Sequence, residues 1–208
     1  MLSRMASDLL ICVATELEGA LLRARLGGLQ GRIGRRAIEL VISGIGPVNA
    51  AHAVARRDAP ELVVCGVGGA YPDSGLVVGD VACAETEHYA DLGIEGSYDM
   101  EAAGFKVVAG HYNRLPLSLF PAARRVPFVT SSTCTATDAR AREIVVRTGG
   151  AVESMEGAAV VHVALLEGKP VGEIRGIANP VGERDRSAWR VREAAEAAQR
   201  ALIDWLEC

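Results

Sequence analysis

Short, continuous apolar runs alternate with alanine-rich helical segments along most of this chain, and this alternation limits its fold more than any other feature. Strands are predicted at 9–14, 38–43, 61–65, 77–84, 128–131, 151–155 and 171–178. Helices are predicted at 17–26, 48–57 after Pro47 at a first helical turn, 138–148 capped by Thr137 or Asp138, and 157–166, with a final amphipathic helix carrying Ala198, Leu202, Trp205 and Leu206. Strands that are apolar on both faces are typical of parallel sheets covered by helices on both sides. The sequence therefore predicts an α/β fold with a mixed, mostly parallel central sheet flanked by helices.

The length fits a single domain. The chain has 208 residues, half of them hydrophobic, which is enough to build one buried core. There is no internal repeat, linker or low-complexity segment, so we expect one domain over residues 1–208 with a flexible N-terminus at 1–7. The stretch 88–123 mixes glycine, proline and aromatic residues, and it is predicted to form loops with one strand at 105–109.

Charge and cysteine usage bear on the partners and the compartment. The net charge is −4 and the basic residues are scattered, which disfavours nucleic acid as a partner. No apolar run is long enough for a signal segment or a membrane span. The five cysteines are odd in number and form no CxxC pair, which favours free thiols in the cytoplasm. His52, His88 and His111 lack the spacing of metal ligands, so no metal site is predicted.

Polar residues and glycine turns follow several predicted strands, at the edge where ligands bind in sheets of this kind. They are Thr15, Glu16 and Glu18, then Gly44–Pro47, Gly66–Gly69, Glu156 and Asn179. Two carboxylates and an amide at one edge suit a small polar ligand and acid–base chemistry. Each also has a structural explanation: the glycines as ordinary turns, either carboxylate as a partner of a helix dipole, and Asn179 as a turn cap. His162, Trp189 and Trp205 are interpreted as core residues.

One familiar nucleotide motif is only partly present. The segment Gly44-Ile45-Gly46-Pro47-Val48-Asn49-Ala50 follows a strand and imitates the dinucleotide-binding GxGxxA pattern. That pattern requires an acidic residue at the end of the next strand, which here reads Val64-Cys65-Gly66. The dinucleotide reading is therefore disfavoured, although a non-catalytic nucleotide-binding α/β module stays open as a rival to an enzyme.

Taken together, six segments resemble the nucleoside phosphorylase and nucleosidase superfamily. They are ATELEGALL (14–22), SGIGPVNAA (43–51), CGVGGAY (65–71), VGD (78–80), VESMEGAAV (152–160) and RGIANPVGERD (175–185), in family order over almost the whole chain. YADLG (89–93) and the Asn-x-Val-Gly-x-Arg-Asp run at 179–185 resemble the futalosine hydrolase branch, which belongs to an alternative menaquinone pathway.

The resemblance implies a role for each matching position. Glu18 matches the carboxylate that activates water, and Met155 and Glu156 match the pair that holds the ribose, with Glu156 on its hydroxyls. Arg175 matches a residue beside that carboxylate. The remaining substrate contacts are expected from Ile45 and Gly46 in one glycine turn and from Gly68 and Gly69 in the next.

Two departures from the family pattern bear on specificity. Asn179 stands where adenine-specific methylthioadenosine/adenosylhomocysteine nucleosidases have aspartate, and an amide donates well to a 6-oxopurine but supplies no proton. Cys134, in the loop SSTCTAT, stands where relatives carry an aromatic that stacks on the base, so Tyr71, Tyr89 or Phe128 are the candidates to replace it.

The resemblance therefore implies hydrolysis of futalosine to hypoxanthine and dehypoxanthine futalosine. Arginines that bind phosphate in phosphorylases are missing before Gly66, where Val64 and Cys65 stand, so water is expected as the nucleophile; Arg23 and Arg25 are interpreted as solvated helix charges. The alternatives are a methylthioadenosine/adenosylhomocysteine nucleosidase and a broader purine nucleoside hydrolase. No metal or organic cofactor is implied, and relatives suggest a homo-oligomer, with a dimer favoured. Arg114, Arg184 or a residue of a second subunit are the candidates for the carboxylate at the far end of the substrate.

Overall fold

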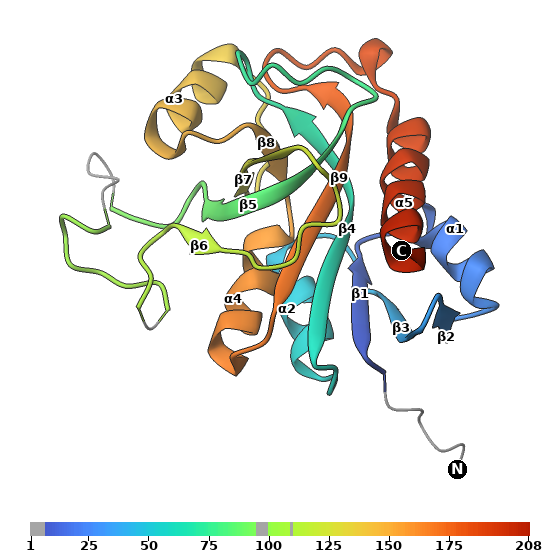
Figure 1. The fold of residues 1–208 in the computed structure, drawn as a ribbon. Coiled ribbons are helices and arrows are strands. Elements are labelled where there is room, and N and C mark those ends of the chain that lie inside the picture. The colour runs from blue at the N-terminus through green and yellow to red at the C-terminus, as the bar shows by residue number, and fades with distance from the viewer. Residues whose placement is uncertain (1–6, 95–99, 109) are drawn as a thin grey trace.

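The computed structural model describes residues 7–94, 100–108 and 110–208. Its strands are β1 (Leu9–Val13), β2 (Gln30–Ile33), β3 (Arg36–Ile42), β4 (Glu61–Ala70), β5 (Val81–Tyr89), β6 (Leu115–Pro116), β7 (Arg125–Thr130), β8 (Val152–Ser154) and β9 (Val171–Pro180). Its helices are α1 (Glu16–Leu26), α2 (Pro47–Ala55), α3 (Asp138–Thr148), α4 (Gly157–Glu167) and α5 (Val191–Glu207), with a short 3-10 turn at Arg186–Ala188. The predicted α/β fold is confirmed (Figure 1).

The nine strands form one mixed sheet. Parallel pairing joins β1 to β3 and β4, β4 to β9, and β7 to β5 and β8. Antiparallel pairing joins β2 to β3, β6 to β5, β8 to β4 and β9 to β5. Because β9 pairs with both β4 and β5, while β8 joins β4 to β7, five strands close into a ring, β4–β9–β5–β7–β8. The part with β1, β3 and β2 extends from this ring as an open sheet.

Strands β1 and β3 of the open part are buried on both faces, as their continuous apolar runs predict, whereas the edge strand β2 is mostly exposed. Along β1, Leu10 and Cys12 belong to one core, and Leu9, Ile11 and Val13 belong to the other. The first core lies toward α2 and α4, and the second toward α1 and α5, so the helices stand on opposite sides of β1 and β4 (Figure 1). In the part of the chain that the structure describes, no helix is both long and apolar enough to cross a membrane.

Helix ends follow their sequence signals. The side chain of Thr137 caps α3 by accepting from the backbone N–H of Arg140, as predicted. Pro47 opens α2 at the first turn, after Gly46 in a positive-φ conformation. In α5, Ala198, Leu202 and Leu206 are buried, and Trp205 is half-buried under the guanidinium of Arg36.

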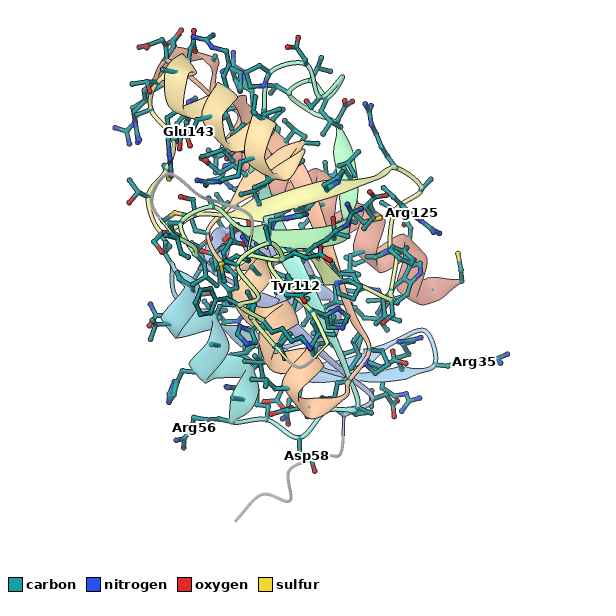
Figure 2. The ribbon with its side chains drawn as sticks, turned by 90° about the vertical axis from the view of Figure 1, so that its left-hand side faces the viewer. Arg35, Arg56, Asp58, Tyr112, Arg125 and Glu143 are labelled. Carbon is teal, nitrogen blue, oxygen red and sulfur yellow. The ribbon has the colours of Figure 1, made fainter. Side chains whose placement is uncertain are left out.

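Charged side chains are spread over the periphery rather than gathered on one face. Figure 2 shows Arg56 and Asp58 pointing outward near the bottom of the molecule, with Arg35 and Arg125 pointing outward on the right-hand side. All four are exposed. This mixture of signs agrees with the scattered basic residues of the sequence.

Two strand predictions are wrong in their bounds. The strand predicted at 61–65 does not end at Cys65: it is β4, which runs through the glycines to Ala70. The strand predicted at 77–84 begins only at Val81, because Val77 and Asp80 exchange hydrogen bonds in a turn and Gly79 has a positive φ; it then continues to Tyr89.

The strand predicted at 105–109 is absent from residues 105–108, and Ala109 lies outside the described residues. Phe105 is exposed and Val108 makes only an isolated bridge to His111, because the backbone N–H groups of Val107 and Val108 bond locally to the carbonyl of His111. Strand β2, an antiparallel edge strand, was not predicted. Most of the N-terminal segment expected to be flexible, residues 1–6, also lies outside the described residues.

Candidate active site

Glu18 is the first carboxylate of the site, and the start of α1 places it. Thr15 caps the helix by accepting from the backbone N–H of Glu18, and its hydroxyl donates to Glu18 Oε2 at 2.8 Å. The backbone N–H of Val67 in β4 donates to Glu18 Oε1 at 2.9 Å. Glu18 is 4% exposed, whereas Glu16 in the same turn is exposed and pairs with Arg23. A helix-dipole role alone does not account for Glu18, because it does not require the carboxylate to be buried and bonded to a distant strand.

Glu156 is the second carboxylate, at the N-cap position of α4. Its side chain caps nothing in its own helix. Instead its Oε1 accepts from the backbone N–H of Gly46 at 3.1 Å, and its Oε2 lies 3.4 Å from both terminal nitrogens of Arg175. Glu156 thus links the turn before α2 to β9 and is 5% exposed.

Arg175 lies between the two carboxylates. It is 1% exposed, and its Nη1 donates to the carbonyl of Val67 at 3.1 Å and lies 4.0 Å from Glu18 Oε1. Burial by itself would lower the pKa of Arg175, but the charges of the carboxylates around it raise that pKa above its ordinary value, so the guanidinium stays charged.

The glycines of β4 make this arrangement possible. A Cβ at Gly66 would lie 2.5 Å from Glu18 Oε1 and 2.7 Å from Arg175 Nη1. A Cβ at Gly68 would lie 2.6 Å from Val152 Cγ1, and one at Gly69 would lie 2.6 Å from Val181 Cγ2. The predicted Gly66–Gly69 turn is therefore wrong: these glycines lie in a strand, where they admit neighbouring side chains.

A cavity of about 300 Å³ brings the predicted residues together. The predicted residues lining it are Glu18, Ile45, Gly68, Gly69, Cys134, Met155, Glu156, Arg175 and Asn179. Gly46 does not line it and acts through its N–H on Glu156 instead. These residues converge on one cavity, as expected from their places in the sequence. The cavity is also lined from inside three strands, β4, β8 and β9, and not only by residues that follow strands.

Asn179 lies near the end of β9 and is half-buried. Its Nδ2 donates to the carbonyl of Pro180 at 2.8 Å. Since an amide nitrogen carries two hydrogens, one is free of this contact and can reach a ligand in the cavity. The interpretation of Asn179 as a turn cap therefore accounts for only one of the two N–H groups of its amide.

The loop after β7 contributes Cys134, which is exposed and lies 3.5 Å from the sulfur of Met155. This loop is held by Glu153, whose carboxylate accepts from the backbone N–H of Thr135 at 3.0 Å, from the Thr135 hydroxyl, and from the hydroxyl of Tyr71 at 2.8 Å. Glu153 also lines the cavity and was missed in the sequence, because nothing there distinguishes it from a polar residue of an ordinary strand.

None of the three aromatics proposed to replace a stacking ring lines the cavity. Tyr71 and Phe128 are buried in the core, and Tyr89 contacts His162, which is half-buried rather than fully in the core. Trp189 does line it, so its assignment to the core is wrong. The sequence signal for Trp189 was its place in the loop that follows Asn179.

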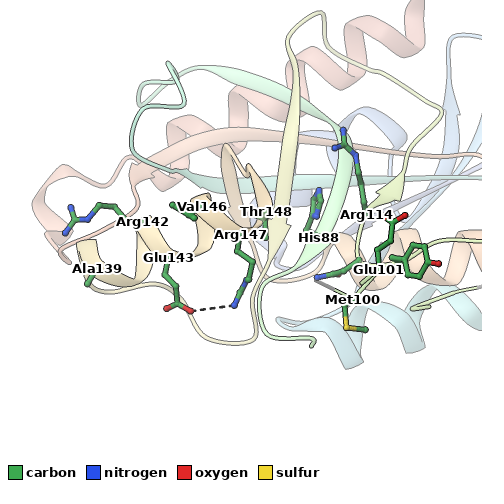
Figure 3. A pocket seen from close by; sticks show the side chains of 12 residues that line it. His88, Met100, Glu101, Arg114, Ala139, Arg142, Glu143, Val146, Arg147 and Thr148 are labelled. Atoms are coloured by element: carbon green, nitrogen blue, oxygen red, sulfur yellow. Dashed lines mark ion pairs between the residues drawn. The ribbon is translucent and has the colours of Figure 1, made fainter. Parts of the chain in front are cut away.

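Two candidates for binding a substrate carboxylate lie apart. Arg184 lines the cavity and stands over the ring of Trp189, 5.0 Å from its centre. Arg114 lines a second, larger cavity of about 730 Å³ between α3 and the irregular segment (Figure 3). In that view Arg114 and His88 lie on one side and Glu143 pairs with Arg147 on the other. Only Arg184 of these two is placed at the site.

Within the described residues, no group of three or more His, Cys, Asp or Glu side chains is placed to hold a metal ion. Cys12, Cys65 and Cys83 are buried as predicted, whereas Cys134 and Cys208 are exposed, and all five are free thiols. Burial raises the pKa of Cys12 to about 11, so this thiol stays protonated.

Comparison with known proteins places this fold and site in a class. The Phosphorylase superfamily model matches residues 23–207, so the chain belongs to the phosphorylase superfamily. Its fold matches the crystal structure of S-adenosylhomocysteine nucleosidase from Streptococcus pyogenes in complex with 5-methylthiotubericidin, with a TM-score of 0.83 and 24% identity over 99% of this chain and 98% of that one.

Within this superfamily the chain groups with the futalosine hydrolases. It is 37% identical over 185 residues to the futalosine hydrolase of Streptomyces coelicolor, which covers 79% of this chain and 76% of the relative. It is 34% identical over 176 residues to that of Thermus thermophilus, covering 77% of each. The family predicted from the sequence motifs is confirmed.

Proposed function

We propose that this protein hydrolyses the N-glycosidic bond of futalosine, releasing hypoxanthine and dehypoxanthine futalosine in menaquinone biosynthesis. The observation that carries the proposal is the convergence of Glu18, Glu156 and Asn179 on one cavity with Arg175 between the carboxylates. The futalosine hydrolases of Streptomyces coelicolor and Thermus thermophilus support the choice of substrate.

The two carboxylates take different roles. Cleavage of a glycosidic bond passes through an oxocarbenium-like state that carries positive charge on the sugar. Glu156 accepts from the ribose hydroxyls and stabilises that charge, while Met155 packs under the sugar. Glu18 takes the proton of the attacking water, since its Oε2 is already oriented by the Thr15 hydroxyl.

Water is the proposed nucleophile rather than phosphate. Val64 and Cys65 are buried apolar residues of β4, where a phosphorylase would need an arginine. Arg23 and Arg25 are occupied in exposed ion pairs with Glu16 and Glu207.

Asn179 is proposed to select the base. Its amide N–H donates to the 6-oxo group or N7 of hypoxanthine, whereas an adenine leaving group would need an acid at this position. Ile45, Gly68, Gly69 and Cys134 complete the walls of the cavity around the substrate. Arg184, beside Trp189, is the proposed donor for the carboxylate at the far end.

The remaining features of the proposal concern the whole protein. We place it in the cytoplasm, because buried free thiols suit a reducing compartment. It acts as a single nucleosidase domain over residues 1–208, as a homo-oligomer with a dimer favoured, and without a metal or organic cofactor.

The test is an endpoint assay without phosphate on futalosine, inosine and methylthioadenosine, with the free bases separated by chromatography. Hypoxanthine from futalosine alone supports the proposal, adenine from methylthioadenosine overturns the specificity, and no base from any substrate favours a binding module. The variant Glu18→Gln should lose about 10²–10⁴-fold in kcat. Glu16→Gln, an exposed glutamate in the same helical turn, is the matched control and should keep full activity.

A further inference from the structure

Two carboxyl groups that no step above uses lie against one another beneath the candidate site. Glu87 of β5 and Glu173 of β9 are both fully buried. Within the described part of the chain, Glu87 Oε1 and Glu173 Oε2 have no hydrogen-bond donor. Both atoms lie beside Gly157, where a Cβ would be 2.1 Å from Glu173 Oε2 and 2.2 Å from Glu87 Oε1. The missing side chain at Gly157, directly after Glu156, therefore leaves the room in which the two carboxyls meet.

The other two oxygens are satisfied, and this locates the proton. Glu87 Oε2 accepts from the hydroxyl of Thr130 and from the backbone N–H of His88, both at 3.1 Å. Glu173 Oε1 accepts from Arg175 Nε at 2.7 Å. Two ionised carboxylates would leave two buried acceptors without donors and bring like charges together, which is costly in the interior. One proton on Glu87 Oε1, donated to Glu173 Oε2, removes both costs.

The charges around Glu87 agree with this assignment. Burial, and next the charge of Glu173, raise the pKa of Glu87 well above its ordinary value. Arg175 from β9 and Thr130 from β7 act in the opposite direction, but the guanidinium is engaged by Glu173 itself. The Thr130 hydroxyl is in turn oriented by the backbone N–H of Ala158, at 2.7 Å in the first turn of α4.

Glu173 connects this pair to the site through Arg175. It holds the Nε edge of the guanidinium, while the terminal nitrogens face Glu156 and Glu18. Without Glu173, the positive charge of Arg175 would be balanced only by Glu18 and Glu156. It would then weaken their attraction to a positively charged sugar in the cavity. Glu173 balances the charge of Arg175 at the Nε edge of the guanidinium.

We propose that Glu87 and Glu173 share one proton and form a positioning pair for Arg175. Glu173 orients and neutralises the guanidinium, so that Glu18 and Glu156 keep their negative charge toward the sugar, and protonated Glu87 supplies the hydrogen bond that holds Glu173 in place. Both residues act through Arg175 and touch no substrate. The kinetic consequences rest on the proposed function, whereas the shared proton does not.

The shared proton is tested on the free protein by infrared spectroscopy. At neutral pH the wild-type protein should show the C=O stretching band of a protonated carboxylic acid, and Glu87→Gln should lack it. Glu101→Gln, a change at an exposed glutamate, is the control and should keep the band. Identical spectra for the wild-type protein and Glu87→Gln would overturn the proposal. This measurement needs no substrate, so it stands whatever the outcome of the futalosine assay.

The positioning role is tested by kinetics on futalosine. Glu87→Gln keeps a neutral donor toward Glu173 and should retain kcat within about threefold. Glu173→Gln leaves the charge of Arg175 unbalanced and should lower kcat by about tenfold or more with a smaller change in KM, because the lost effect acts mainly in the transition state. A Glu173→Gln variant with wild-type kcat would overturn this role.

A double-mutant cycle separates this role from a merely structural one. In an Arg175→Met background, Glu173→Gln should lower kcat no further, since its effect passes through Arg175. An equal further loss in that background would overturn the positioning role. So would a large loss of kcat in a Glu87→Gln variant whose melting temperature is that of the wild-type protein. If wild-type protein releases no hypoxanthine from futalosine, the proposed function fails, and the infrared result alone decides the shared proton.

Discussion

Gly66 offers a direct test of how the candidate base is held. A Cβ at this position would lie 2.5 Å from Glu18 Oε1, whereas ordinary contacts begin near 3.4 Å. In Gly66→Ala the carboxylate must therefore retreat by about 0.9 Å, and a misplacement of about 1 Å costs on the order of 10²-fold in rate. That loss corresponds to about 2.7 kcal/mol of transition-state stabilisation. The hydrogen bond from the Val67 N–H to Glu18 is lost in the same movement.

The assay is hypoxanthine release from futalosine, with the melting temperature measured on the same samples. Overpacking costs about 1–3 kcal/mol of stability, so Gly66→Ala should melt a few degrees lower but remain folded. Gly172→Ala is the matched control, because a Cβ there lies 2.6 Å from the carbonyl oxygen of Leu119, in a buried strand away from the site. It should lose comparable stability and little activity.

Two results would refute the reasoning. If Gly66→Ala keeps wild-type kcat while folded, Glu18 does not act from the position it occupies here. If Gly172→Ala loses as much kcat as Gly66→Ala, the loss reflects strain in the sheet and not the placement of the carboxylate.

Three further predictions follow from other parts of the molecule. Asn179→Asp should shift the preference between 6-oxo and 6-amino nucleosides by about tenfold toward adenine, because the carboxyl group can protonate N7; base release from paired substrates measures it. Alkylation of the native protein should modify only Cys134 and Cys208, the two exposed thiols, as counted by mass spectrometry. Burial and the charge of Arg114 lower the pKa of His88 to about 4, so it is neutral in the folded state. Unfolding releases it to bind a proton, so stability should fall by up to about 3 kcal/mol as the pH drops from 6.5 to 4, and His88→Gln should remove that part of the fall in thermal melts.

Each of these has a contrary result. An unchanged substrate preference in Asn179→Asp would refute the role of the amide in base selection. More than two alkylated cysteines in folded protein would contradict the burial of the other three. Parallel stability curves for the wild-type protein and His88→Gln between pH 4 and 6.5 would show that the imidazole is not held neutral.

The sequence alone determined the class of fold and the main chemical groups. Continuous apolar runs such as the one that became β1 specify a strand buried on both faces, because hydrophobic periodicity is a local property of the chain. Glu18, Glu156 and Asn179 lie at or just after the ends of the strands predicted from such runs, and their convergence can be predicted from the rule that ligands bind at one edge of the sheet.

The tertiary structure alone decided how these groups are held. Gly66 has the local signature of a turn, yet it lies in a strand because β4 pairs with β9 through this position, and its missing side chain leaves room for those of Glu18 and Arg175. Glu87 and Glu173 are 86 positions apart in the sequence, and only the closure of the sheet into a ring, with β9 paired to β5, brings them together. The local hydrophobic pattern shows that a segment forms a strand, but it does not show which distant strand that segment pairs with.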